Sequence, residues 1–223
     1  MSILDGDDID LVDNGVLRQI SFEENIAQKY MENADEFFES MLSDRDEVYE
    51  LLPSIKTEDN SDFEYNYTFN IDNNELNSFL NSQSITQNQF FCSVFAYTLS
   101  RFSGSSKVLF NLIEDGRGHI DLSESVGMFV HTLPLLIDCK NQSVSSFLDY
   151  SSNLINSVMK YDLYPFRLLA NQYDLNSNIL FQYSHNLFQT ITNEEDAYAV
   201  DDLKQDIIGD LSFFRLCRNP HFS

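Results

Sequence analysis

Two short stretches of the sequence carry polar side chains at positions where they could do chemistry. VGMFVHTLPLL, residues 126–136, places His131 and Thr132 inside an apolar run that is predicted to form a buried strand. A buried polar pair costs free energy unless it is hydrogen-bonded, so either neighbouring backbone satisfies it or the pair lines a site. Gly116 and Arg117 end another apolar run. An arginine fixed there could pair with a carboxylate or receive an anionic group, or it could serve the structure by tying two segments of the domain together.

The rest of the sequence contains no pattern typical of a metal site or of nucleophilic catalysis. None of the histidines lies three or four residues from another, and no GxSxG, P-loop or GxGxxG motif occurs. Five aspartates fall within the first 15 residues, but a calcium loop starting at Asp5 would need glycine at Asp10 and glutamate at Val16. We therefore expect no metal, and a flexible acidic tail over residues 1–20. The histidines are His119, His131, His185 and His221.

Composition limits the class of protein. With 223 residues, 43% of them hydrophobic, the chain can bury the core of one substantial domain. The formal net charge of −23 disfavours nucleic acid and anionic membranes as partners. No apolar run approaches the roughly 18 residues of a membrane span, and the acidic N-terminus is not a secretory signal. The three cysteines are widely spaced, so no disulfide framework is expected and the cytoplasm is the simplest location.

Helices and strands are predicted to alternate around these residues. Ser21 and Glu24 have capping-box spacing before a long amphipathic helix that reaches Leu42. This order favours a layered α/β (or α+β) domain, a mixed sheet with flanking helices, over residues 21–223. The other expected helices are a short one capped by Asp72, one over 86–102, one from Val144 to Val158 and one with Pro165 in its first turn; the expected strands are 63–71, 107–117, 126–138, 178–189 and LSFF near the end.

Taken in order, these segments resemble the C-terminal half of the condensation domain of nonribosomal peptide synthetases. That family carries a (V/I)GxFVNT motif, often followed by an arginine. Here His131 stands in place of the asparagine, and Leu136 in place of the arginine. LSRFSGSSKVLFNLIEDGR resembles a family helix ending in LSRYSG and a strand leading to GR, and YDLYPFR resembles HQDYPFE. The resemblance spans roughly residues 21–190 and weakens afterwards. The matching motif residues are Val126, Gly127, Phe129, Val130, Thr132, Tyr164, Pro165 and Phe166.

The resemblance implies one lobe of a chloramphenicol-acetyltransferase-like fold, in which two lobes enclose a tunnel. Carrier proteins would present thioesters tethered to phosphopantetheine from opposite sides, and an amine would attack a thioester to form an amide. No cofactor would be bound directly by this chain. His131 and Thr132 would face the tunnel or anchor its wall. The tunnel or lobe-interface candidates are Gly116, Arg117, Gly127, Phe129, His131, Thr132, Pro165 and Phe166.

One departure from the family pattern is large. The family's catalytic signature, HHxxxDG, belongs to the N-terminal lobe, and this sequence has no adjacent histidine pair. We therefore expect a chain without catalytic residues of its own, inactive alone, and dependent on the N-terminal lobe. The apolar face left without that lobe could lead to self-association. Two alternatives stay open: a non-catalytic lobe that binds a carrier or another protein, and a coenzyme A-dependent acyltransferase of the same superfamily. Epimerization and cyclization relatives also share this lobe.

Overall fold

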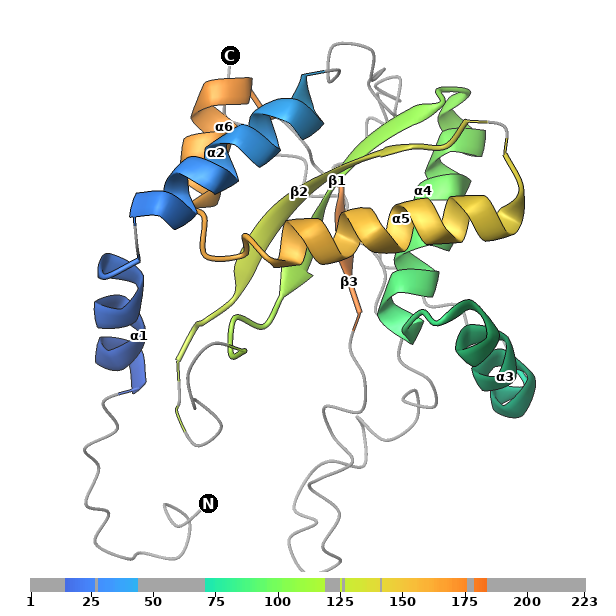
Figure 1. Ribbon diagram of the computed structural model, residues 1–223, viewed down its shortest axis with the longest axis horizontal. Helices are drawn as coiled ribbons and strands as arrows, with labels where there is room; N and C mark the ends of the chain where they lie inside the picture. Colours follow the sequence, from blue (N-terminus) through green and yellow to red (C-terminus); the bar gives the residue numbers. More distant parts are fainter. Residues whose placement is uncertain are drawn as a thin grey trace, which may run out of the picture.

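A three-stranded mixed sheet forms the centre of the fold in the computed structural model (Figure 1). The structure describes residues 15–26, 28–43, 71–118, 125, 127–140, 142–175 and 179–183. Strand β1 (Lys107–Glu114) lies between β2 (His131–Asp138), to which it is antiparallel, and β3 (Leu180–Gln182), to which it is parallel. The helices are α1 (Gly15–Glu24), α2 (Gln28–Leu42), α3 (Asn73–Gln83), α4 (Gln87–Ser103), α5 (Val144–Met159) and α6 (Phe166–Tyr173).

One face of the sheet is apolar along most of its length and supplies the core. Side chains two residues apart in a strand point to the same face, and in β1 these are Val108, Phe110 and Leu112. They lie opposite an apolar set of β2, and all of these side chains are fully buried. The β2 set is Ile137, Leu135 and Leu133.

Pro134 lies in β2 opposite Asn111. Proline has no N–H to donate to a strand ladder, so it is tolerated best where one side of the strand is unpaired. Among the described strands β2 is at the edge of the sheet. This position accounts for a proline within an apolar strand.

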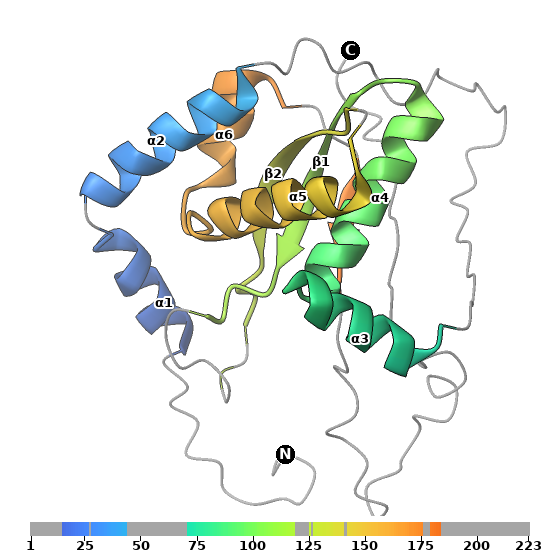
Figure 2. The ribbon, with the colours of Figure 1, turned by 45° about the vertical axis from the view of Figure 1, so that its right-hand side comes forward.

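Helices α4 and α5 lie side by side across the apolar face (Figures 1 and 2). Phe95 of α4 contacts Phe110 and Phe181, with ring centroids 5.0 and 5.4 Å apart. The start of α4 is fixed by a capping box, in which Thr86 and Gln89 each accept the other's backbone N–H at 3.2 and 2.8 Å. These contacts fix α4 against the sheet.

Helix α2 is attached to the connection between α5 and α6 (Figure 2). The backbone N–H of Leu163 donates to the Tyr30 hydroxyl at 3.1 Å, and the Tyr164 hydroxyl donates to Asp35. Phe38 is fully buried and packs against the Tyr164 ring, 5.5 Å between centroids. Segments from the two ends of the described chain therefore share one core.

The expected mixed sheet with flanking helices is confirmed, but several boundaries differ. The long first helix is two helices, and its start is Gly15 rather than Ser21, so the predicted capping box lies inside α1 and residues 15–20 are not a flexible tail. The strand expected over 126–138 begins only at His131, and Pro165 precedes α6 as its N-cap residue. The strand predicted over 63–71 lies outside the described residues up to position 70, as do positions 184–189 and LSFF.

No helix in the described part of the chain is both long and apolar enough to cross a membrane.

Candidate functional site

Gly116 permits a close approach between the ends of β1 and β2. Its φ is +67°, a left-handed conformation that glycine adopts without a steric penalty. A Cβ at this position would lie 1.7 Å from the Phe129 carbonyl oxygen and 3.3 Å from His131 Nε2. The turn after β1 is therefore packed directly on the backbone that leads into β2.

Arg117 is held over an aromatic ring by this turn. Its guanidinium carbon lies 4.5 Å from the centroid of Phe129, within the range of a cation–π contact, and Nη1 donates to the Ser125 carbonyl at 3.1 Å. The backbone N–H of Arg117 donates to Asp115 at 3.0 Å. Arg117 thus ties the segment before β2 to the end of β1, as the structural alternative for this residue predicted.

Gly127 brings the same segment against α1. A Cβ on Gly127 would lie 2.7 Å from a methyl group of Val16 and 3.0 Å from the Phe129 ring. Beside this contact is a group of exposed apolar side chains, which we call the α1 patch. Its members are Val16, Leu17, Ile20, Met128 and Val130, and Met128 is 92% exposed.

His131 faces a carboxylate of α1. Its Nε2 lies 3.5 Å from Glu23 Oε1, an ion pair when the imidazole is protonated. The same oxygen accepts a 2.6 Å hydrogen bond from the amide of Gln19, which is buried. The polar side chain in the apolar run of β2 is therefore matched by polar side chains of α1.

Glu114, the last residue of β1, lies directly opposite His131 in the sheet register. Because the strand alternates, Glu114 continues the face of Phe110 and Leu112 and is largely withdrawn from water. Burial raises the pKa of Glu114 to about 7, with a smaller contribution from the negative charge of Asp115, while a hydrogen bond with Asn88 lowers it. Near neutral pH this carboxyl group is present in both its protonated and its ionised form.

A row of buried polar atoms runs along this end of the strand pair. Among the described residues, no hydrogen-bond partner is found for Gln19 Oε1, Asn88 Oδ1, Glu114 Oε1 and His131 Nδ1. The two amide oxygens can only accept hydrogen bonds. Buried polar groups are nearly always hydrogen-bonded in folded proteins, so this row is suited to a partner that supplies donors.

Thr132, Pro165 and Phe166 are placed differently from the other candidate residues. Thr132 lies opposite Ile113 on the other face of the sheet, since neighbouring residues of a strand alternate. His131 and Thr132 therefore do not form a pair that lines one surface. Pro165 and Phe166 open α6, which packs on β2, and among the described residues no hydrogen bond or ring contact joins them to Gly116 or His131.

Glu23 and Glu114 were not predicted as site residues. Glu114 could have been found by continuing the period-two pattern of β1, whereas Glu23 has no signal in the sequence that relates it to His131. Within the described ranges, no three His, Cys, Asp or Glu side chains are close enough together to hold a metal ion. His119 and Val126 lie outside those ranges.

The comparisons with known proteins agree on one family. The family model described as "Condensation domain" matches residues 20–211. The chain belongs to the condensation-domain family. Two proteins of Bacillus subtilis (strain 168) are similar: surfactin synthase subunit 2 is 34% identical over 83 residues, and a plipastatin synthase is 29% identical over 106 residues. The matches cover 37% and 47% of this chain, but only 2% and 4% of those proteins.

Solved condensation domains have the same fold. The first condensation domain of the calcium-dependent antibiotic synthetase, in complex with a substrate analogue, matches with a TM-score of 0.57 and 13% identity over 81% of this chain. The condensation domain from the Monacolin K polyketide synthase MokA matches with a TM-score of 0.56 and 18% identity over 78% of this chain. Each match covers 43% of the solved chain. This condensation-domain chain therefore spans less than half the length of those structures.

Proposed function

We propose that this chain is the C-terminal lobe of a nonribosomal peptide synthetase condensation domain. The observation that carries the proposal is the family match over residues 20–211 together with a fold match that covers 43% of a solved condensation domain. The order of the motifs, from LSRFSG through GMFVHT to YPFR, resembles the second half of the family. The similar synthases, of which the matches cover only 2% and 4%, support a place within a much longer synthetase. We assign that synthetase to the cytoplasm.

The α1 patch supports the proposal that this chain packs against an N-terminal lobe. Three of its five apolar side chains belong to α1 and two to the segment that leads into β2, and each is between 41% and 92% exposed. A contiguous exposed apolar surface marks an interaction site on a soluble domain. We assign this surface to the N-terminal lobe, and we expect the isolated chain to self-associate through it.

The row of buried polar atoms beside the α1 patch also supports a partner lobe on this side of the chain. Its acceptor atoms are buried at the end of the strand pair, where a second lobe or a substrate amine would supply the donors. In this arrangement Gly116 and Arg117 fix the backbone around Phe129, and Glu23 orients His131. Thr132, on the other face of the sheet, and Pro165 and Phe166, at the start of α6, would support the tunnel wall rather than contact substrate.

The reaction assigned to the complete domain is amide formation between thioesters held on the phosphopantetheine arms of carrier proteins. The amine of the acceptor attacks the donor carbonyl, the C–N bond forms, and the C–S bond breaks to release the donor thiol. The sequence contains no HHxxxDG motif, so the histidine that acts near the amine would come from the N-terminal lobe. This chain would position groups and would not catalyse the step alone.

The test compares the purified chain with the same chain joined to an HHxxxDG-bearing N-terminal lobe. Both are incubated with loaded donor and acceptor carriers, and the carrier-bound product is measured by mass spectrometry. We expect amide product only from the two-lobe protein. Product from the chain alone would refute the need for a second lobe. A correctly folded two-lobe protein that binds both carriers but forms no product would favour the alternative, a non-catalytic lobe that docks a carrier.

A further inference from the structure

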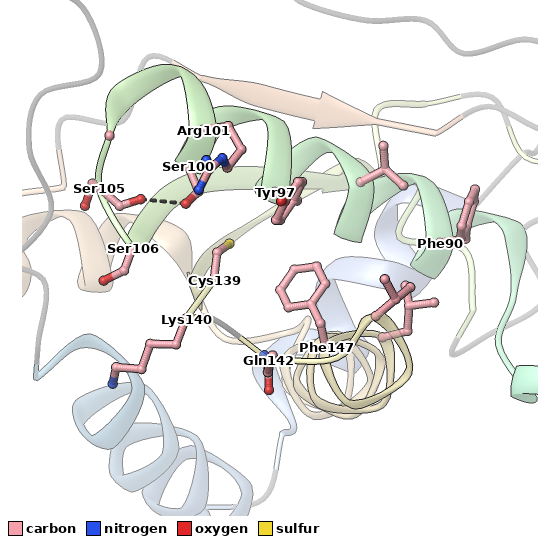
Figure 3. A pocket seen from close by; sticks show the side chains of 14 residues that line it. Phe90, Tyr97, Ser100, Arg101, Ser105, Ser106, Cys139, Lys140, Gln142 and Phe147 are labelled. Carbon is pink, nitrogen blue, oxygen red and sulfur yellow. Dashed lines mark hydrogen bonds between the residues drawn. The ribbon is translucent and has the colours of Figure 1, made fainter.

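A groove runs along α4 and α5 and reaches the end of the β1–β2 pair that lies opposite Gly116 and His131. Figure 3 shows Tyr97 and Phe147 projecting into it from the two helices, with Cys139 at its inner wall. Its volume is about 650 Å³. Ser106 and Cys139, which line it, flank the far end of the strand pair, roughly 23 Å along β1 from Glu114. The groove is therefore separate from the site assigned to condensation.

The apolar surface of the groove extends onto its rims. Phe147 and Leu148 form a buried floor, 8% and 3% exposed. Val94 and Tyr97, one turn apart on α4, and Val144 at the start of α5 are 43%, 50% and 71% exposed. A small molecule in the hollow would leave these rim side chains in water. A helix lying along the groove would cover the floor and both rims, the geometry of helix-in-groove recognition.

The charged side chains that line the groove are basic, whereas the chain as a whole is acidic. The protein has 36 acidic and 13 basic residues, yet within the described ranges no Asp or Glu lines the groove, whereas Arg101 and Lys140 do. Lys140 is ion-paired with Asp138 and points away from the hollow in Figure 3. Arg101 is exposed in the last turn of α4 and forms no ion pair with any described residue. An acidic partner would be repelled by most of this protein and attracted here.

We infer that the α4–α5 groove binds an acidic amphipathic helix of a partner protein, with its apolar side chains on Tyr97 and Phe147 and a carboxylate on Arg101. Charge restricts the partner to this groove, and the apolar floor supplies most of the affinity. Binding at this groove is independent of amide formation, because no residue of the groove or its rims has a role in that reaction.

The experiment uses the full chain and a labelled peptide of about 15 residues, roughly four helical turns. The peptide carries leucines at i, i+3, i+4 and i+7 and glutamates elsewhere, and binding is followed by fluorescence anisotropy. Arg101→Glu is compared with Lys29→Glu, an exposed residue of α2, because both substitutions change the net charge equally. Tyr97→Ser removes an apolar rim contact without changing charge.

We expect binding to the wild type, a loss of at least about tenfold with Arg101→Glu and with Tyr97→Ser, and little change with Lys29→Glu. A peptide in which serines replace the leucines should not bind. Equal losses for the two charge reversals would overturn the inference, because the attraction would then be unspecific. Binding of octanoate at this groove without binding of the peptide would also overturn it, in favour of a small apolar anion.

Discussion

Gly116→Ala tests whether the close approach of the two strand ends holds the candidate site together. The new methyl group would lie 1.7 Å from the Phe129 carbonyl oxygen, whereas real Cβ contacts essentially never fall below 3.0 Å, so the two backbones must separate by at least about 1.3 Å. The left-handed φ of +67° adds strain of its own. A left-handed non-glycine residue costs about 1–2 kcal/mol, and a forced backbone shift costs about 1–3 kcal/mol.

Gly104→Ala provides the matched control. Gly104 has a similar φ of +72°, but a Cβ there would meet nothing within 4 Å. The control therefore carries the backbone strain without the clash. We expect a loss of about 1–2 kcal/mol for Gly104→Ala and about 2–5 kcal/mol, the strain and the clash together, for Gly116→Ala.

Urea unfolding followed by circular dichroism measures both variants. With a slope of roughly 2 kcal/mol per molar urea, the midpoint should fall by about 0.5–1 M for Gly104→Ala and about 1–2.5 M for Gly116→Ala. Equal midpoints for the two variants would show that the Gly116 turn is not packed on Phe129, and the account of the site would be wrong.

Three further substitutions test the surrounding contacts. Because the folded-state pKa of Glu114 is raised to about 7, its neutral form is favoured on folding, so this contribution to stability is present below about pH 4.5 and is lost as pH rises through 7. The wild type should lose stability relative to Glu114→Gln between pH 5 and pH 8, and a constant difference in urea midpoint would contradict this. Tyr164→Phe removes the hydroxyl that donates to an α2 carboxylate and should cost about 1–2 kcal/mol, more than Tyr161→Phe in the same thermal melts. His131→Ala in a two-lobe domain should slow amide formation at least about tenfold while unfolding shifts by less than about 1 kcal/mol, since its partner carboxylate is 42% exposed; an insoluble variant would instead indicate a structural role.

Local signals in the sequence predicted the helices and strands that depend on them. Asp72 accepts the backbone N–H of Asn74 and Glu75, as its type and position indicated. The helix over 86–102 is confirmed as α4 within one residue at each end, since a capping threonine and a left-handed glycine fix its limits. The strand expected over 126–138 is confirmed only from His131 onward, where its apolar run pairs with that of β1.

Features that depend on distant segments were not predictable in the same way. Ser21 has the spacing of a helix start, yet α1 begins at Gly15 and packs against Gly127, a contact more than 100 residues away in sequence. The ion pair between Glu23 and His131 likewise joins segments that are far apart in the sequence, so no local pattern predicts it. In contrast, strand alternation alone places His131 and Thr132 on opposite faces of the sheet. The sequence interpretation considered the two side chains as one polar pair and did not apply this alternation.

The hydrogen bonds that Leu163 donates to Tyr30 and Tyr164 donates to Asp35 also affect folding during synthesis. They join residues 133 and 129 positions apart. At roughly 5–20 residues per second, a ribosome needs about 7–25 s to make that length. During this interval the apolar side of α2, including Phe38, has no completed core to pack on. Nascent chains of this protein should therefore expose a site for chaperones until Tyr164 has left the ribosome.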